Sequence, residues 1–422
     1  MSSLSRRRFL QLTSAAAGAT AAGAFSPSGA AVAAGPDKRG KKDKSPWLQV
    51  RPGADPSGFD PWLEIDSAAL QHNAKEVSRL AGGRPILAVV KNNAYGLGDT
   101  AIGPILDRCP EVAGIACVRV SEAVALREAG VRKPILNMAE VAEAEAAELV
   151  ERNVWLSCWL DGSGERLDRL ARRFRRPIPV HLYIDAGMGR EGMPDYRALS
   201  WIEDLVRRKS ARIDGTYQMF VHQLDFDREQ VARFLRLTNE ARSKGLPLGK
   251  LHAAPSYEVF FLPESHLDMV RPGNALLGNY PQEERAREMA SLRPVFRLCA
   301  RVVRVEQLRA GDSASFRRQY IASRPTWIAL LPVGHTDGYP AAAANTSKVL
   351  INGRLYPVVA VVSSTHTIVE VGEERAVEVG DVATLICPDD PAIEPGVIAA
   401  NSGIDVFRMI TKFSALLPRK VV

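Results

Sequence analysis

An alternation of short apolar runs with helix-type segments extends through residues 85–280 and constrains the fold more than any other feature. The runs are rich in β-branched residues and bounded by proline, glycine or asparagine, which is typical of strands buried on both faces. Eight runs occur, at residues 85–90, 112–118, 134–138, 154–160, 178–184, 212–220, 251–254 and 268–270. Eight strands in a βα alternation favour a parallel (β/α)8 barrel over an open sheet.

Helix-type segments separate the first runs. We expect helices at residues 101–107, 121–130, 141–152 and 164–174. Ser121 is the expected N-cap of the second helix, and Gly130 is its expected stop signal.

The pattern changes after residue 292. Strand-type runs then follow at short spacing, with turn signals at Gly311 and at Asn352-Gly353, and a short helix is expected over 406–416. We therefore predict an α/β protein with a barrel over residues 61–292 and a C-terminal β-rich domain over residues 293–422.

The first residues have the form of a twin-arginine export signal. Arg6 and Arg7 precede a weakly apolar stretch at 12–24, and Ala31-Val32-Ala33 fits a cleavage pattern. We expect a signal peptide over 1–33, a basic flexible linker over 34–60, and export to the periplasm or the cell exterior. A disordered basic N-terminus is the alternative.

The net charge of +7 is concentrated in these N-terminal residues, which leaves the remaining body nearly neutral. The basic charge therefore does not indicate a nucleic-acid partner. No uncharged apolar stretch reaches the about 18 residues of a membrane span, so we expect none in the mature form. The five cysteines lack metal-site spacing. We expect buried thiols and no metal site, and leave disulfide pairing open.

Lys91 directly follows the first apolar run of the predicted barrel. The carboxyl ends of parallel strands are where catalytic sites gather. A partly desolvated lysine there has a lowered pKa and can form a Schiff base with a carbonyl cofactor. From spacing alone, a lysine that caps the strand and points to water remains the alternative.

Four motifs occur in order along the chain: AVVKNNAYG at 88–96, HLYIDAGMGREG at 181–192, MVRPG at 269–273 and LPVGHTDGY at 331–339. Together they resemble the alanine racemase family, the fold-type III enzymes that use pyridoxal 5′-phosphate (PLP). The resemblance extends from about Trp62 to the C-terminus. It implies a PLP-binding barrel followed by a β domain, an amino acid as the small-molecule substrate, and a homodimer with shared active sites.

The resemblance assigns the cofactor contacts. Lys91 would hold PLP as a Schiff base and act as one of two acid/base groups at Cα. The hydroxyls of Tyr95 and Ser256, and the backbone around Gly273 and Asn274, would contact the phosphate. Hydroxyls and exposed amides suit a phosphate dianion.

Two arginines also match family positions. Arg271 would face the pyridine nitrogen and, because it stays protonated, keep that nitrogen unprotonated. Arg190 would help to place the substrate carboxylate and order the opposing base.

The chain departs from the family at the second base. The family tyrosine at the start of the β domain, which reaches the partner's active site, is matched here by Phe316. Phenylalanine moves no proton. Tyr320 follows four residues later and is a candidate for the missing role.

Three more departures lie around the substrate. Met219 takes the place of a histidine near the cofactor ring, with His222 close in sequence. His335 replaces a phosphate-binding tyrosine and could keep that contact. Ser364-Thr365 replaces a Met-Asp pair that frames the substrate, which makes Ser364 a candidate substrate contact.

These observations favour a PLP-dependent racemase that interconverts L- and D-amino acids by Cα deprotonation, with a substrate range differing from alanine. Two alternatives stay open. One is a PLP enzyme with another Cα chemistry, such as epimerisation or an aldolase-like cleavage. The other is a non-catalytic, exported PLP-binding protein.

Overall fold

The computed structural model describes residue 58 and residues 60–422. The predicted export signal at 1–33 lies outside the described residues, as does the predicted linker except for residues 58 and 60. Within the described part of the chain, no helix is both long and apolar enough to cross a bilayer.

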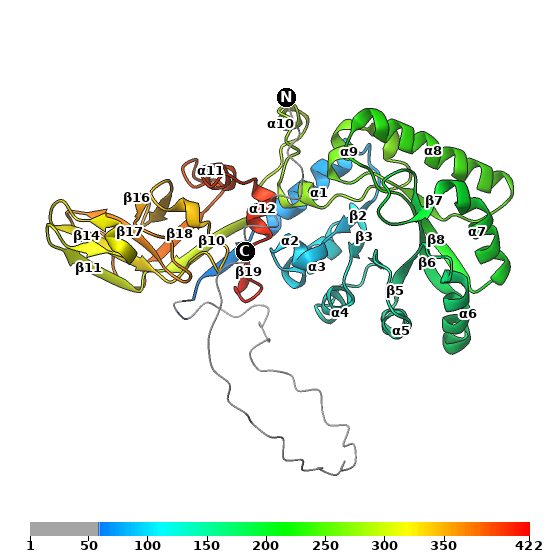
Figure 1. The fold of residues 1–422 in the computed structure, drawn as a ribbon, viewed down its shortest axis with the longest axis horizontal. Helices are drawn as coiled ribbons and strands as arrows, with labels where there is room; N and C mark the ends of the chain where they lie inside the picture. The colour runs from blue at the N-terminus through cyan, green and yellow to red at the C-terminus, as the bar shows by residue number, and fades with distance from the viewer. Residues whose placement is uncertain (1–57, 59) are drawn as a thin grey trace, which may run out of the picture. The chain divides into compact units, whose positions relative to one another are not determined.

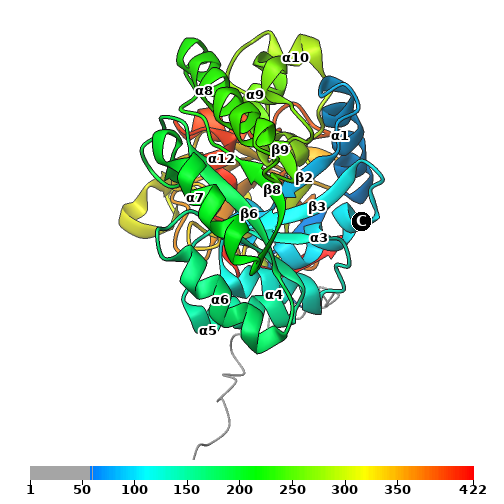
Figure 2. The same cartoon turned by 90° about the vertical axis from the view of Figure 1, so that its right-hand side faces the viewer.

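Parallel strands form the predicted barrel (Figures 1 and 2). The path runs from β2 through six further strands, and residues Met269 and Val270 close it by bridging His252 and Ile86. The predicted (β/α)8 architecture is confirmed, with the eighth strand reduced to these two residues. The strands are β2 (Ile86–Val89), β3 (Val112–Cys117), β4 (Ile135–Asn137), β5 (Val154–Cys158), β6 (Ile178–Asp185), β8 (Ala211–Tyr217) and β9 (Lys250–His252); the short β7 (Met193–Pro194) pairs with β6 alone.

Helices cover the outside of the strands, as the ring of α4 to α8 in Figure 2 shows. α7 illustrates why: its buried residues Ala198, Trp201, Ile202 and Leu205 recur at helical spacing and form one apolar face. The helices are α1 (Ser67–Leu80), α3 (Asp99–Arg108), α4 (Val120–Glu128), α5 (Glu143–Glu151), α6 (Ser163–Phe174), α7 (Asp195–Arg208), α8 (Leu224–Ser243) and α9 (Ser256–Phe261), with the short α10 (Ala286–Met289) after them.

The expected N-cap of α4 is wrong. The helix begins at Val120, so Ser121 lies inside its first turn. Glu122 performs the capping instead, because its Oε2 accepts hydrogen bonds from the backbone N–H groups of Val118 (3.0 Å) and Arg119 (2.9 Å).

The C-terminal domain is built on a nine-stranded sheet in the order β11-β14-β17-β16-β15-β18-β10-β1-β19. β1 (Trp62–Ile65) pairs antiparallel with β10 and parallel with β19 (Arg419–Val421). Residues 62–65 therefore lie in the predicted barrel range but belong to this sheet. The other strands are β10 (Phe296–Arg301), β11 (Arg304–Leu308), β14 (Thr326–Leu331), β15 (Lys348–Ile351), β16 (Arg354–Val359), β17 (Thr367–Gly372) and β18 (Val382–Ile386).

Smaller elements complete the domain. A two-stranded hairpin, β12 (Ser313–Ala314) and β13 (Tyr320–Ile321), stands apart from the main sheet. The expected final helix is shorter than predicted, as α12 (Val406–Ile410), and is preceded by α11 (Pro395–Asn401), which the sequence did not suggest. All five cysteines are buried and none is in a disulfide.

Candidate active site

Lys91 opens a left-handed turn at the carboxyl end of β2. In α2 (Lys91–Tyr95), residues Asn92, Asn93, Ala94 and Tyr95 all have φ between +49° and +56°. Asparagine tolerates this conformation, but alanine and tyrosine each cost about 1–2 kcal/mol there. Such strain persists only where the surrounding structure imposes it, and it clusters at functional sites.

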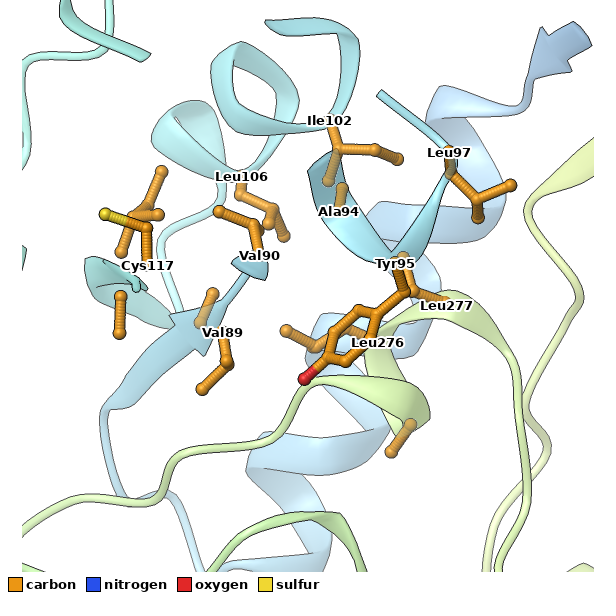
Figure 3. Packing of buried hydrophobic residues seen from close by; sticks show 14 of the residues in the cluster. Val89, Val90, Ala94, Tyr95, Leu97, Ile102, Leu106, Cys117, Leu276 and Leu277 are labelled. Atoms are coloured by element: carbon orange, nitrogen blue, oxygen red, sulfur yellow. The ribbon is translucent and has the colours of Figure 1, made fainter. Parts of the chain in front are cut away.

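Contacts from distant segments hold the turn. The Asn93 N–H donates to Glu122 Oε1 at 3.2 Å, which ties the turn to α4. The buried Arg419 of β19 donates from Nη2 to the carbonyl of Gly96 at 2.8 Å. Figure 3 shows Ala94 packed near Ile102, and the ring of Tyr95 beside the segment that carries Leu276 and Leu277. The turn that positions Lys91 is therefore fixed from several sides.

Lys91 lines a cavity of about 560 Å³ at this end of the barrel. The residues that the sequence assigned to the cofactor, apart from His335, converge on this cavity. They are Lys91, Tyr95, Ser256, Arg271, Gly273 and Asn274.

One end of the cavity suits a phosphate group. Ser256 Oγ accepts the backbone N–H groups of Gly273 and Ala275, each at 3.1 Å, so its own proton is left to donate outward. A Cβ on Gly273 would overlap the Tyr95 hydroxyl, so only glycine leaves this space. Asn274 lines the same cavity. This cluster of hydroxyl and amide groups fits the phosphate of PLP.

Arg271 is a fixed cation in the cavity wall. Its guanidinium is fully buried and donates to His252 Nδ1 and His252 O, both at 2.8 Å, and to the Gln218 carbonyl at 2.7 Å. Burial lowers the pKa of Arg271 to about 10, so it remains protonated at neutral pH.

The histidines behind Arg271 are neutral. Burial lowers the pKa of His181 to about 3 and that of His252 well below its usual range, and the positive charge of Arg271 adds to both effects. His181 Nδ1 lies 2.8 Å from His252 Nε2, so the two rings share one hydrogen bond. A neutral, hydrogen-bonded pair therefore anchors the guanidinium that faces the cavity.

Arg190 approaches Lys91 from another direction. It lines an adjoining cavity of about 240 Å³ together with Lys91, Tyr183 and Tyr217. Its side chain is about half exposed and pairs with Glu191 at 3.5 Å. A half-exposed guanidinium beside the reactive amine is suited to bind a carboxylate in exchange for its long contact with Glu191.

Burial lowers the pKa of the Lys91 amine, and the positive charges of Arg190 and Arg271 lower it further. In the protein without PLP, we expect Lys91 to react with an amine-selective reagent with a pH midpoint below the usual lysine value of about 10.4. In Arg190→Gln the midpoint should rise, because the protonated amine loses a repelling charge. It should stay below the usual value, since burial is the larger cause. Mass spectrometry of the Lys91 peptide across pH measures both midpoints, and equal midpoints would contradict this account.

Three predicted site residues lie in the β domain and line neither of these two cavities. Tyr320 is in the β12–β13 hairpin, where burial and nearby Glu370 raise its pKa to about 12. His335 Nε2 lies 3.5 Å from Ser364 Oγ. A single described chain therefore does not bring Tyr320, His335 or Ser364 to Lys91.

Sequence reasoning missed several residues that shape the site. Phe407 of α12 lines the Lys91 cavity and packs edge-on against Tyr95, with ring centroids 5.7 Å apart. His222 also lines the cavity, and its Nδ1 lies 2.8 Å from Oε1 of the buried Glu258. The position of His222 close to Met219 was the only signal in the sequence for this pair.

The sequence matches known families over almost all of the described residues. The family described as "Alanine racemase, N-terminal domain" matches residues 65–281, and "Alanine racemase, C-terminal domain" matches residues 295–421. The chain belongs to the alanine racemase family. Because members of this family use PLP, the chain is a PLP-dependent amino-acid racemase, as predicted.

Individual relatives agree with this assignment. The alanine racemase of Carboxydothermus hydrogenoformans is 32% identical over 363 residues, covering 85% of this chain and 98% of the relative. That of Syntrophobacter fumaroxidans is 34% identical over 311 residues, covering 72% of this chain and 81% of the relative. The solved alanine racemase of Streptomyces coelicolor superimposes with a TM-score of 0.75 at 27% identity, covering 86% of this chain and 98% of that one.

Proposed function

We propose that this enzyme interconverts L- and D-amino acids with Lys91 as one of two acid/base groups. The observation that carries the proposal is the Lys91 amine of lowered pKa, in one cavity with the hydroxyl cluster and the buried Arg271. When bound, PLP supplies the electron withdrawal that acidifies the Cα–H bond of an attached amino acid.

Residues of the chain would bind the cofactor and control the protonation of its ring nitrogen. Tyr95, Ser256, Gly273 and Asn274 would bind the phosphate and so fix the cofactor. Arg271 would face the ring nitrogen as a protonated guanidinium and keep it unprotonated, which would moderate the electron withdrawal and favour return of the proton to Cα.

The substrate is handled on the Lys91 side of the cavity. Arg190 binds the substrate carboxylate, and Lys91 removes or returns the Cα proton. A carboxylate held by a guanidinium restricts the rotation of the substrate, so that one Cα–H bond can face the amine.

A homodimer with shared sites completes the proposal. Phe316 and Ile321, on and beside the β12–β13 hairpin, are large apolar side chains that are 69% and 53% exposed. Exposed apolar side chains of this size favour a protein–protein contact. In the dimer, three residues of the β domain would line the Lys91 cavity of the other subunit. They are Tyr320, a candidate second base, His335 and Ser364.

The substrate range is proposed to differ from alanine. The relatives named above are alanine racemases, and alanine is therefore the reference substrate. Ser364 and Thr365, both exposed in the described chain, offer small polar side chains in place of the methionine and aspartate that the family resemblance leads us to expect.

A chiral assay over a panel of amino acids in D₂O tests this function. We expect L- and D-forms of at least one amino acid to interconvert, with deuterium entering Cα of both enantiomers at comparable rates. Turnover restricted to alanine would contradict the altered range. Product other than the enantiomer would favour another Cα chemistry, and no turnover with any amino acid would contradict racemisation.

Export by the twin-arginine route is proposed from the sequence of residues 1–33 alone. Proteins that use this route cross the membrane folded, so PLP would be loaded before export. Replacing Arg6 and Arg7 by lysine should leave the uncleaved protein inside the cell, as measured by fractionation. Unchanged export of that variant would contradict the route.

A further inference from the structure

A histidine–carboxylate pair stands in the wall of the Lys91 cavity. His222 follows β8 and precedes α8, whereas Glu258 lies in α9, so two neighbouring barrel loops meet here. His222 Nδ1 and Glu258 Oε1 are 2.8 Å apart. The Glu258 side chain is fully buried, but 49% of the His222 side chain is exposed. Glu258 thus lies behind a histidine that remains open to the cavity.

The backbone and its neighbours fix the orientation of His222. Its φ of +62° is a strained value for a residue with a side chain. The ring of Tyr257 packs edge-on against the His222 ring, with centroids 5.6 Å apart. Because Nδ1 is engaged by Glu258, Nε2 is the ring nitrogen left for other partners. No hydrogen bond to Nε2 occurs within the described residues.

We propose that His222 is the second acid/base group of the reaction and that Glu258 is its positioning residue. This inference rests on the proposed racemase function and supplies the role that Phe316 cannot fill. A buried carboxylate bonded to one imidazole nitrogen fixes the tautomer and stabilises the imidazolium, as in other enzymes with a carboxylate–histidine pair.

The proton transfers balance between the two groups. In one direction the Lys91 amine accepts the Cα proton, and the electron pair of the broken C–H bond stays on the cofactor-bound substrate. His222 Nε2–H then gives its proton to the opposite face of Cα, which forms the new C–H bond. Lys91 ends protonated and His222 ends neutral, and the reverse turnover or exchange with solvent restores both.

Several charged groups face His222 and decide its protonation. Glu258 and Tyr257 approach from α9, Asp227 from α8, and Arg190 from the loop after β6. The hydrogen bond to Glu258 raises the pKa of His222, whereas burial and, to a smaller extent, Arg190 oppose this shift. Burial raises the pKa of Glu258 itself, while His222 opposes that shift. Glu258 therefore favours the imidazolium form of His222.

The test compares His222→Gln and Glu258→Gln in the PLP-loaded full chain. His72→Gln is the matched control, because His72 is a partly exposed histidine of α1 that lines neither cavity. Bound-PLP absorbance should match the wild type in all three variants. In His222→Gln, racemisation should fall by about 10²–10⁴-fold. Lys91-dependent exchange of the Cα proton for deuterium should persist in one enantiomer only.

A second readout does not depend on turnover. In the protein without PLP, the imidazole resonance of His222, assigned by its loss in His222→Gln, should titrate with a raised pKa that drops in Glu258→Gln. The pH profile of kcat/KM should shift in the same direction in Glu258→Gln. The titration tests the hydrogen bond itself, and the shift of the kcat/KM profile would be absent if the pair were purely structural.

Three results overturn the inference while leaving the proposed function in place. They are racemisation within about threefold of wild type in His222→Gln, a His222 pKa unchanged in Glu258→Gln, and one-sided exchange in Tyr320→Phe rather than in His222→Gln. Failure of the wild-type enzyme to racemise any amino acid would instead overturn the proposed function on which the inference rests.

Discussion

Lys91→Ala is expected to lower racemisation by about 10⁴-fold or more and to abolish the visible absorbance of bound PLP. The variant loses both the amine that attaches the cofactor and one acid/base group, and each loss alone removes a large rate factor. Absorbance spectra after dialysis, together with a chiral assay, measure the two effects.

Lys244→Ala is the matched control for this change. Lys244 lies at the end of α8, exposed and paired with Glu203 at 2.8 Å, and lines neither cavity. Its replacement should leave absorbance and racemisation as in wild type. Retained absorbance and turnover in Lys91→Ala would show that another lysine carries the cofactor.

Gly273→Ala is expected to weaken PLP binding by about 10- to 100-fold. The added methyl would overlap the Tyr95 hydroxyl, and Tyr95 cannot retreat because its ring packs against Phe407 and its backbone lies in the left-handed turn. Overpacking of this kind costs about 1–3 kcal/mol, here at the phosphate end of the cavity. Titration of the protein with PLP measures the affinity.

Gly162→Ala is the corresponding glycine control. Gly162 has φ of −80°, and a Cβ there would have no atom within 4 Å, so the change should be neutral. Equal PLP affinity in Gly273→Ala and wild type would contradict the placement of the phosphate beside Tyr95 and Ser256.

The barrel was predictable because its strands are short, apolar on both faces and separated by helix-type segments. The assignment of β1 was not predictable from local pattern. Residues 62–65 pair with β10 and with β19, which are more than 200 residues away. The sequence around Trp62 contains no signal for either pairing. For the same reason β19 was not predicted from the sequence, and neither was the hydrogen bond from its Arg419 to the carbonyl of Gly96.

The site was predictable where motifs carry it. Lys91, Tyr95, Ser256, Arg271, Gly273 and Asn274 were assigned from the sequence and share one cavity. The two asparagines after Lys91 were a signal for a left-handed turn, but Ala94 and Tyr95 were not, because neither favours positive φ.

The rest of the site depends on packing between loops. Glu258 is 36 residues from His222, and only the fold brings the two together. Glu122 supports the Lys91 turn through a backbone contact that no motif encodes. The roles of Tyr320, His335 and Ser364 remain predictions, because these side chains do not line the Lys91 cavities of the described chain.

Reduction of the purified enzyme with borohydride, followed by peptide mapping, tests the central claim most directly. The reaction fixes imine-bound PLP to the lysine that holds it. We expect a reduced phosphopyridoxyl group on the peptide that contains Lys91 and on no other. Label on a different lysine, or no label at all, would contradict it.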